Sequence, residues 1–413
     1  MPTDRAVVGS VVGSVAGSVA GSVVAPATTD RLRRDNAARV LRSLRDDGPA
    51  SRAQLAQRTG LAKATVGAIV TDLVSAGAVR DDDPVADVGR TGRPGRPVSL
   101  DGSDVVGLGL EVNVDYVAAT ALDLAGRPRL STQVPLPPSD ADAAGLALQR
   151  LARDSLAALE ADGRRVLGVT VAVPGLVDRT TGTVVGAPNL HWRERDVASD
   201  LRTILGPRPV WVDNDANCAA SGEASFGVAR GVDHVLYLTG TVGIGAGLVV
   251  DGRVERGAHG LAGEVGHAPL GDSSRPCACG RTGCWETAVG LEALVRESGV
   301  ELPAGSALDP VSVASMVVEQ CASDPLVASG VDRLCRSLAT GLSVLALTLD
   351  PSLIVLGGFF VPLGDRLLPV VRERLSGASR TDVALSTLGL HAASTGAAAD
   401  VLGQVFTGAL ALT

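Results

Sequence analysis

Residues 263–286 read GEVGHAPLGDSSRPCACGRTGCWE and contain four side chains that bind soft metal ions. These side chains are His267, Cys277, Cys279 and Cys284. Three thiolates and one imidazole complete a tetrahedral shell without an open position for water, so the stretch predicts a structural zinc site. Gly280 and Gly283 allow the tight turns that this spacing needs. The alternative is a disulfide, but Cys277 and Cys279 are one residue apart and nothing in the sequence indicates an oxidising compartment.

Two carboxylates flank the predicted metal ligands. Glu264 precedes His267 by three residues, which places both side chains on one face of a helical turn. Glu286 follows Cys284 by two residues. A metal-bound imidazole keeps its other nitrogen free to donate, so these groups form a row of donors and acceptors suited to a polyhydroxylated ligand. We expect the zinc to orient a sugar site without contacting the sugar.

The run GEVGH at 263–267 followed by CACGRTGCWE at 277–286 resembles the signature of the ROK family (repressors, open reading frames, kinases). This family joins bacterial sugar kinases to sugar-responsive transcription factors. The resemblance extends from about Arg33 to the C-terminus. It implies an α/β chain with an N-terminal winged helix-turn-helix and a two-lobed, actin-like (ribonuclease H-like) ATPase-fold body whose cleft lies between the lobes.

The net charge of −8 is unevenly distributed over the 413 residues. Residues 30–96 carry a balance of +4, whereas the body is acidic, so only the N-terminal module is expected to contact phosphates. Three further cysteines lie in apolar surroundings and are expected to be buried free thiols: Cys218, Cys321 and Cys335. Free thiols fit a reducing compartment, so we expect a cytoplasmic, nucleoid-associated protein without a membrane partner.

Residues 1–29 are uncharged and repetitive between positions 6 and 27. A membrane span needs about 20 strongly apolar residues, and the frequent glycines and serines make this segment a poor one. A signal peptide is the second alternative, but the charged region before the segment is thin and a DNA-binding pattern follows directly. We favour a disordered low-complexity tail or a misassigned start.

Residues 30–100 show the pattern of a winged helix-turn-helix. One apolar helix face is formed by Val40, Leu41 and Leu44. Ser51 and Gln54 predict a capping box that opens a short second helix. A third helix places four apolar residues on one stripe, namely Val66, Ile69, Val70 and Leu73.

The third helix is the predicted recognition helix. Because such a helix enters the major groove with its N-terminal end first, Lys63, Ala64 and Thr65 are the expected contacts to base edges or phosphates. Similar proteins usually have serine where Ala62 stands, and the missing cap should cost about 1 kcal/mol of helix stability. The run RTGRPGRP at 90–97 resembles an arm for phosphates or a narrow minor groove, and its alternative is a charged linker. Its arginines are Arg90, Arg93 and Arg96.

The body, residues 101–413, predicts two α/β lobes because strand signals recur from Val105 and again from Val235. We expect lobe 1 at about 101–230 plus 390–413, and lobe 2 at about 231–389 with the zinc loop 263–286. The apolar helix predicted for 397–412 should pack back on lobe 1.

Asn214 and Asp215 follow a predicted strand at its carboxyl end, where open α/β sheets bind ligands. The resemblance implies that Asp215 takes a proton from a sugar hydroxyl in the kinases and that Asn214 orients the sugar. An Asn-Asp pair alone is more often a turn or a helix cap. Together with the metal-loop residues, the expected sugar-binding set is Gly175, Asn189, Asn214, Asp215, Glu264, His267 and Glu286.

Phosphoryl transfer also needs a cradle for the triphosphate and magnesium. The glycine-rich turn at 240–247 is present, with one extra residue against the family's spacing. Where the family's kinases carry Asp-x-Gly-Gly-Thr, residues 111–115 read EVNVD, and we expect Val112 and Val114 to obstruct the phosphates. Gly357-Gly358 resembles the adenosine-side glycines, or is a strand-to-helix turn. We therefore expect ATP and magnesium not to bind well and Asp215 to remain as a vestigial base.

These patterns predict a sugar-responsive transcriptional regulator, most simply a repressor, that binds double-stranded operator DNA and a small sugar or amino sugar. A homodimer or a dimer of dimers would place two winged helices on a palindromic operator. The first alternative is an active ATP-dependent, glucokinase-like sugar kinase with a DNA-binding extension. The second is a constitutive DNA-binding protein whose sensor no longer responds.

Overall fold

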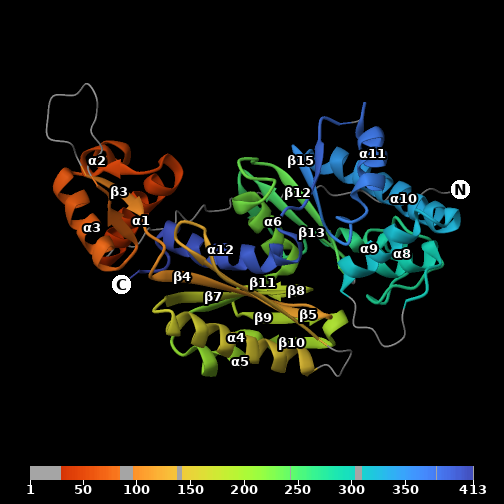
Figure 1. Cartoon of the computed structure of the whole chain (residues 1–413), viewed down its shortest axis with the longest axis horizontal. Helices are drawn as coiled ribbons and strands as arrows, with labels where there is room; N and C mark the ends of the chain where they lie inside the picture. The colour runs from red at the N-terminus through yellow and green to blue at the C-terminus, as the bar shows by residue number, and fades with distance from the viewer. Residues whose placement is uncertain are drawn as a thin grey trace, which may run out of the picture.

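The computed structural model describes residues 29–83, 96–136, 142–241, 243–302, 309–377 and 379–412. The expectations for the tail before Thr29 and for Arg90 and Arg93 fall outside the described residues. A small helical domain lies at one end of the molecule, beside two lobes that each contain a five-stranded sheet (Figure 1). Among the described helices, none is long and apolar enough to cross a membrane.

The N-terminal domain is a winged helix-turn-helix. Its elements are α1 (Thr29–Asp47), β1 (Ala50–Ser51), α2 (Arg52–Thr59), α3 (Lys63–Ser75), β2 (Val79–Asp81) and β3 (Pro97–Leu100). The capping box is confirmed, since Ser51 Oγ accepts from Gln54 N at 3.3 Å and Gln54 Oε1 accepts from Ser51 N at 2.8 Å. Ala62 precedes α3 without a side-chain cap, as expected. The strands pair in the order β1-β3-β2, so β2 and β3 form the wing hairpin.

The predicted apolar faces of α1 and α3 are confirmed, because all seven of their residues are buried in one cluster. The same cluster continues into the body, where it includes Leu122 of lobe 1 and Val401 and Phe406 of the last helix, α12 (Ala392–Thr407). A shared apolar core resists separation because opening it would expose its surface to water. The winged helix is therefore packed onto the body in addition to being linked to it.

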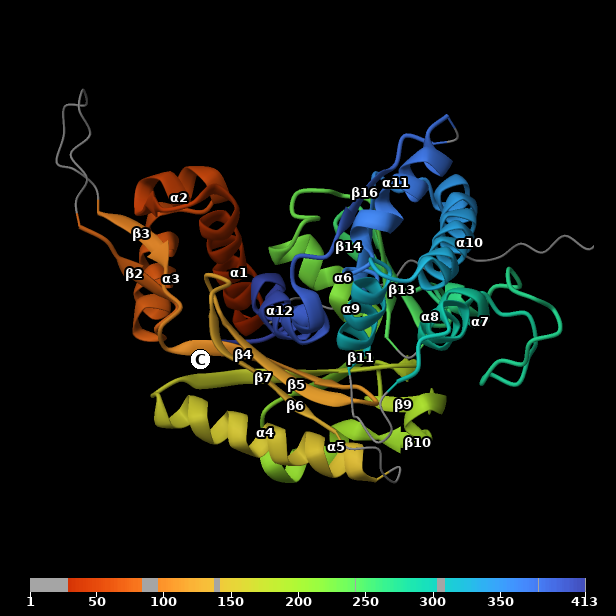
Figure 2. The ribbon, with the colours of Figure 1, turned by 45° about the vertical axis from the view of Figure 1, so that its right-hand side comes forward.

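Lobe 1 is a sheet with the strand order β11-β7-β4-β5-β6. Its elements are β4 (Val105–Val112), β5 (Tyr116–Asp123), β6 (Pro128–Pro135), α4 (Ala143–Ala161), β7 (Arg165–Val173), α5 (Val197–Leu205) and β11 (Val210–Asn214). Helices α4 and α5 cover one face and α12 covers the other (Figure 2). A small second sheet contains β8 (Leu176–Asp178), β9 (Thr183–Ala187) and β10 (Trp192–Asp196), with the 3-10 turn η1 (Pro188–Leu190) between the last two.

Lobe 2 is a sheet with the strand order β14-β13-β12-β15-β16. Its strands are β12 (Val235–Gly240), β13 (Ile244–Val250), β14 (Arg253–Glu255), β15 (Leu353–Gly358) and β16 (Asp382–Leu385). Its helices and 3-10 turns are η2 (Val265–His267), α7 (Glu286–Val289), α8 (Leu291–Ser298), α9 (Pro310–Gln320), α10 (Pro325–Leu349), α11 (Gly364–Leu375) and η3 (Gly389–His391). Cys321 and Cys335 are buried in the core of this lobe, and Cys218 is buried between the lobes, so all three are free thiols as expected.

The two lobes meet through a pair of packed helices, α6 (Asp215–Phe226) and α12. Helix α6 lies against β12 and β13 of lobe 2, and α12 lies against β4, β5 and β7 of lobe 1 (Figure 1). The helices approach closely because a β-carbon at Gly396 would lie 1.7 Å from the carbonyl oxygen of Cys218. A helix that starts at the cleft is thus in direct contact with the helix that holds the winged domain.

The bounds expected for the last helix were wrong. It starts at Ala392, five residues earlier than predicted, and ends at Thr407 rather than at residue 412. Gly408 adopts the left-handed conformation (φ 80°) that terminates helices, and Leu410 and Leu412 then pack into the core shared with α1. The expected packing of this helix on lobe 1 is confirmed.

Candidate functional site

Asn214 ends β11 and caps α6. Its Oδ1 accepts from Asn217 N at 3.0 Å, which satisfies one of the free N–H groups at the start of the helix. Its Nδ2 donates to the carbonyl oxygen of Gly175 at 3.0 Å. The side chain is therefore fixed from both ends, and two of the predicted sugar-site residues, Asn214 and Gly175, are in direct contact.

Asp215 is the first residue of α6 and is 9% exposed. Its Oδ1 accepts from the backbone N–H of Ala216 at 2.8 Å. Burial, with a smaller contribution from the negative charge of Glu264, raises the pKa of this carboxyl to about 6. A carboxylate poised near neutral pH can accept a hydrogen bond or a proton from a sugar hydroxyl.

Glu264, His267 and Glu286 lie together on lobe 2, and Glu264 is close enough to Asp215 of lobe 1 to raise its pKa, so we call these three residues the lobe 2 wall of the cleft. His267 Nε2 lies 3.9 Å from Glu264 Oε2, and His267 Nδ1 lies 3.6 Å from Glu286 Oε1. The predicted row of carboxylate, imidazole and carboxylate is therefore present as a continuous chain of groups. Burial raises the pKa of Glu264, which directly precedes η2.

Asn189 reaches this wall from lobe 1. It lies in η1 with an exposed side chain. A β-carbon at Gly243, in the turn between β12 and β13, would lie 2.8 Å from Glu286 Oε2 and 3.9 Å from Asn189 Nδ2. The glycine-rich turn thus leaves open the space where Asn189 and Glu286 approach each other.

The four predicted metal ligands form one cluster. Their donor atoms, on His267, Cys277, Cys279 and Cys284, all lie within 4.8 Å of one another. Cys277 Sγ is 3.6 Å from His267 Nδ1, and Cys279 Sγ is 3.6 Å from Cys284 Sγ. These separations exclude a disulfide, whose sulfurs lie about 2.05 Å apart, and match the edges of a tetrahedron with zinc–sulfur bonds of about 2.3 Å.

Backbone hydrogen bonds within the loop hold the ligands in place. Cys277 N donates to the carbonyl oxygen of Arg281 at 2.8 Å, and Gly280 N donates to that of Cys277 at 3.0 Å. Gly280 and Gly283 have φ values of 84° and 75°, the left-handed conformation that the sequence spacing predicted for them. Glu286 Oε1 also lies 2.7 Å from Cys277 Sγ, so the cleft and the metal cluster share a carboxylate.

Residues 111–113, in the stretch where the resemblance places a phosphate-binding motif, are buried. Glu111 is 3% exposed and accepts a hydrogen bond from the Tyr116 hydroxyl at 2.6 Å. These residues and Tyr237 line a remaining space of about 20 Å³, which is enough for roughly one water molecule. Gly357 is required by close packing, because a β-carbon there would lie 2.1 Å from the Tyr237 hydroxyl oxygen.

The expectation that Val112 and Val114 project towards the phosphates was wrong. Val112 is buried in the core between the lobe 1 sheet and α4, and Val114 packs against the same cluster. Because side chains alternate between the two faces of a strand, Glu111 rather than Val112 faces the cleft. A buried carboxyl and two phenol rings, not valines, therefore line the small space beside Asp215.

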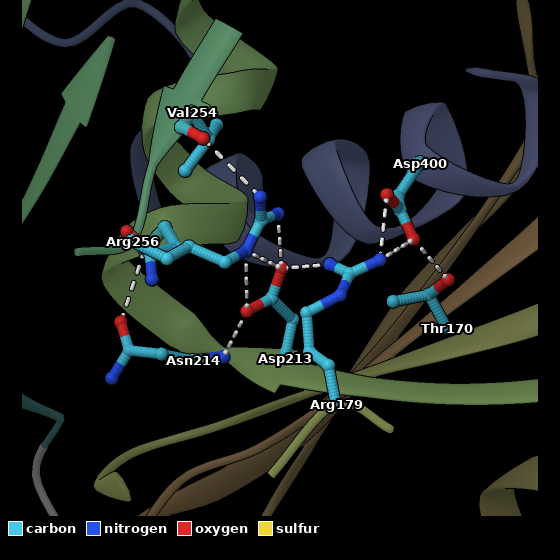
Figure 3. Close-up of polar contacts among 8 residues, drawn as sticks. Thr170, Arg179, Asp213, Asn214, Val254, Arg256 and Asp400 are labelled. Atoms are coloured by element: carbon cyan, nitrogen blue, oxygen red, sulfur yellow. Dashed lines mark hydrogen bonds and ion pairs between the residues drawn. The ribbon is translucent and has the colours of Figure 1, made fainter. Parts of the chain in front are cut away.

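Sequence reasoning missed a polar network beside Asn214. Figure 3 shows Arg179 between the carboxylates of Asp213 and Asp400, with Arg256 on the other side of Asp213. These residues are far apart along the chain, so only the acidic run DND at 213–215 hinted at the site.

The expected DNA-contacting residues stand at the start of the recognition helix and beside the wing. Lys63 and Ala64 are exposed, whereas Thr65 is half-buried. Arg96 is exposed directly before β3. Arg52 of α2 is paired with Asp81 of β2 at 2.6 Å, which fixes the wing hairpin to the helices.

Comparison with known proteins assigns both parts of the chain. Residues 107–408 match the ROK family, and residues 35–83 match the IclR helix-turn-helix domain. The chain belongs to the ROK family and carries a helix-turn-helix at its N-terminus.

Individual relatives include both regulators and kinases. The xylose repressor of Bacillus subtilis (strain 168) is 27% identical over 345 residues, which cover 83% of this chain and 86% of the repressor. A solved ROK family transcriptional regulator, a homolog of the E. coli MLC protein, covers 92% of this chain and 98% of its own, with a TM-score of 0.75 and 24% identity. A ROK family glucokinase from Streptomyces griseus, solved with glucose and AMPPNP, is 29% identical and covers 71% of this chain and 98% of its own, with a TM-score of 0.59.

Proposed function

We propose that this protein is a sugar-responsive transcriptional regulator, acting as a repressor, whose kinase-like body binds a small sugar or amino sugar. The observation that carries the proposal is that the winged helix shares one apolar core with α12, the helix that packs on the cleft helix α6. The similarity to a xylose repressor over 83% of the chain supports it, because that similarity extends beyond the body into the winged domain.

The proposed ligand of the cleft is a sugar because its groups suit several hydroxyls at once. The lobe 1 wall offers two amides and a carboxylate, and the lobe 2 wall offers two carboxylates and an imidazole; these groups accept from and donate to vicinal hydroxyls. The proposed sugar-binding residues are Gly175, Asn189, Asn214, Asp215, Glu264, His267 and Glu286. One homodimer or dimer of dimers would place two winged helices on a palindromic operator. The proposed DNA-binding residues are Lys63, Ala64, Thr65, Arg90, Arg93 and Arg96.

Zinc is the proposed metal of the His267 cluster. Three thiolates and one imidazole with tetrahedral separations are the donor set that structural zinc prefers. The ion would hold the loop that carries His267 and Glu286, and both of these residues are proposed to face the sugar. Its role would be to stabilise the geometry of the site.

The alternative is an active ATP-dependent sugar kinase with a DNA-binding extension. The similarity to a glucokinase solved with glucose and AMPPNP favours it, as does a buried carboxyl at Asp215. The packing beside Asp215 argues against it, because Glu111 and Tyr116 fill space that we expect a triphosphate to need. We therefore propose that Asp215 accepts a sugar hydroxyl without transferring a phosphoryl group.

Sugar binding and sugar phosphorylation can be separated in one set of measurements. Purified full-length protein is titrated calorimetrically with D-xylose, D-glucose, N-acetylglucosamine and N-acetylmannosamine, and sugar phosphate formation is measured with magnesium ATP. We expect at least one sugar to bind without turnover, and Asp215→Asn to weaken that binding by about 10- to 100-fold, the loss of one charged hydrogen bond. Asp154→Asn, on the exposed face of α4, is the matched control.

Two outcomes would contradict the proposal in different ways. Turnover that Asp215→Asn abolishes would support the kinase alternative. Binding of none of the four sugars to the wild-type protein would support a constitutive DNA-binding protein whose sensor does not respond.

A further inference from the structure

Two arginines share one buried carboxylate at the base of the cleft (Figure 3). Asp213 is 4% exposed and directly precedes Asn214, whose backbone N–H donates to Asp213 Oδ1 at 2.9 Å. Arg179, from the turn between β8 and β9, donates to Asp213 Oδ2 through Nη1. Arg256, directly after β14, donates to the same oxygen through Nη2 at 2.6 Å and Nε at 3.2 Å. The two guanidinium groups therefore compete for one oxygen.

The Arg256–Asp213 pair joins the two walls of the cleft. Asp213 lies on β11 of lobe 1, next to the Asn214–Asp215 wall, and Arg256 begins the lobe 2 segment that leads to Glu264. Within the described residues, no other ion pair joins one lobe to the other. Because an ion pair weakens as its charges separate, this contact depends on the distance between the cleft walls.

The other end of the network lies on the helix that holds the winged domain. Arg179 Nη2 donates to both carboxylate oxygens of Asp400 on α12, at 3.3 and 3.2 Å. Six residues further along α12, the carbonyl oxygen of Phe406 accepts from Arg42 of α1 at 2.7 Å. Helix α12 therefore contacts the network at the base of the cleft through Asp400 and the first helix of the DNA-binding domain through Phe406.

We propose that Arg256 is a positioning residue that transmits sugar binding to the winged helix through this network. The inference rests on the proposed function and names the residues that couple its two sites. When both walls bind the sugar, the segment after Arg256 moves towards β11, and the hydrogen bonds from Arg256 to Asp213 become stronger. Arg179 turns from Asp213 towards Asp400, which shifts α12 and, through Phe406, the position of α1.

The substitution Arg256→Gln tests this relay without leaving a buried charge unpaired, because Arg179 still neutralises Asp213. Arg253→Gln is the matched control, since Arg253 begins β14, the strand that ends directly before Arg256, and has an exposed side chain. For each full-length protein, the affinity for a duplex selected by the wild type from a random pool is measured with and without a saturating concentration of the sugar that the wild type binds best. The ratio of the two affinities is the coupling factor. Sugar affinity is measured in parallel.

We expect Arg256→Gln to reduce the coupling factor at least threefold while its sugar affinity and its sugar-free DNA affinity stay within threefold of wild type. Arg256→Lys, which keeps the charge but not the forked geometry, should restore part of the coupling, and Arg253→Gln should retain all of it. A merely structural role would lower sugar and DNA affinity together. An unchanged coupling factor in Arg256→Gln would overturn the relay while the proposed function stands. A wild-type coupling factor of one would overturn both.

Discussion

Glu111 is a buried carboxyl that lies with Tyr116 and Tyr237 around a small space beside Asp215. Burial raises the pKa of this carboxyl from 4.5 to about 8, so it is mostly protonated at neutral pH and donates or accepts as a neutral group. Partial ionisation at higher pH would add a negative charge next to Asp215. Either form is unfavourable for a nearby triphosphate, because the neutral acid fills its space and the carboxylate repels it.

The raised pKa of Glu111 predicts how folding stability depends on pH. Between pH 4.5 and about 8 the folded protein keeps a proton that the unfolded chain has lost, so stability falls as pH rises through this window. Glu111→Gln removes the titration and keeps an oxygen for the Tyr116 hydroxyl. We expect the thermal midpoint of the variant to exceed that of wild type by about 2 °C or more at pH 8 and to differ little at pH 5.

The control for this comparison is Glu319→Gln, on the exposed face of α9. It should shift the midpoint equally at both pH values. A difference between Glu111→Gln and wild type that does not change with pH would contradict a buried, protonated Glu111.

The site residues differ in how far sequence could predict them. His267 and the three cysteines fall within eighteen residues, so their spacing alone defined a tetrahedral donor set. The direction of Glu111 could not be predicted in this way, because a one-residue change of register exchanges the two faces of a strand. Asp213 and Arg256 were missed because their contact joins two lobes, and no local pattern encodes it.

At the level of single elements, the metal loop is the one whose geometry we propose to depend on a zinc ion. Cys284 is 2% exposed, and its removal would break the tetrahedral set. We expect Cys284→Ala to lose stoichiometric zinc, measured by elemental analysis, and to weaken sugar binding at least about tenfold, the range found when the support of a metal site is disturbed. Cys335→Ala, a buried thiol in the core of lobe 2, should retain the zinc.

Two results would contradict this account of the loop. If the wild-type protein purified without stoichiometric zinc, the loop would not need the ion to form. Unchanged sugar affinity in zinc-free Cys284→Ala would show that the loop holds His267 and Glu286 without help from the ion.

Helix α12 is the second element with a testable role. Phe406 is 5% exposed in the core shared with the winged helix, and the guanidinium of Arg45 lies 4.6 Å from its ring centre. Phe406→Ala leaves a cavity there and should cost about 3–5 kcal/mol in urea unfolding. Phe226→Ala, whose ring is 38% exposed, is the control and should cost much less. A similar small loss in both variants would show that the winged helix does not depend on this contact.

On the scale of the whole molecule, the sequence pattern predicted the two domains better than the contacts between them. The winged helix and the α/β body follow from periodicity, which each element carries in its own residues. The contact between α12 and α1 joins residues more than 350 positions apart, as in the hydrogen bond from Arg42 to Phe406. Gly408 ends α12 and returns the chain to α1, and the sequence pattern did not predict this turn.

The central claim is that a sugar in the cleft changes the affinity of the winged helix for DNA. The most direct measurement is fluorescence anisotropy of a selected duplex titrated with wild-type protein at one fixed salt concentration, with and without a saturating sugar from the panel. The account predicts that the sugar weakens DNA binding by about fivefold or more, and that saturating DNA weakens sugar binding by the same factor. Equal DNA affinity with and without a sugar that binds the protein would contradict it.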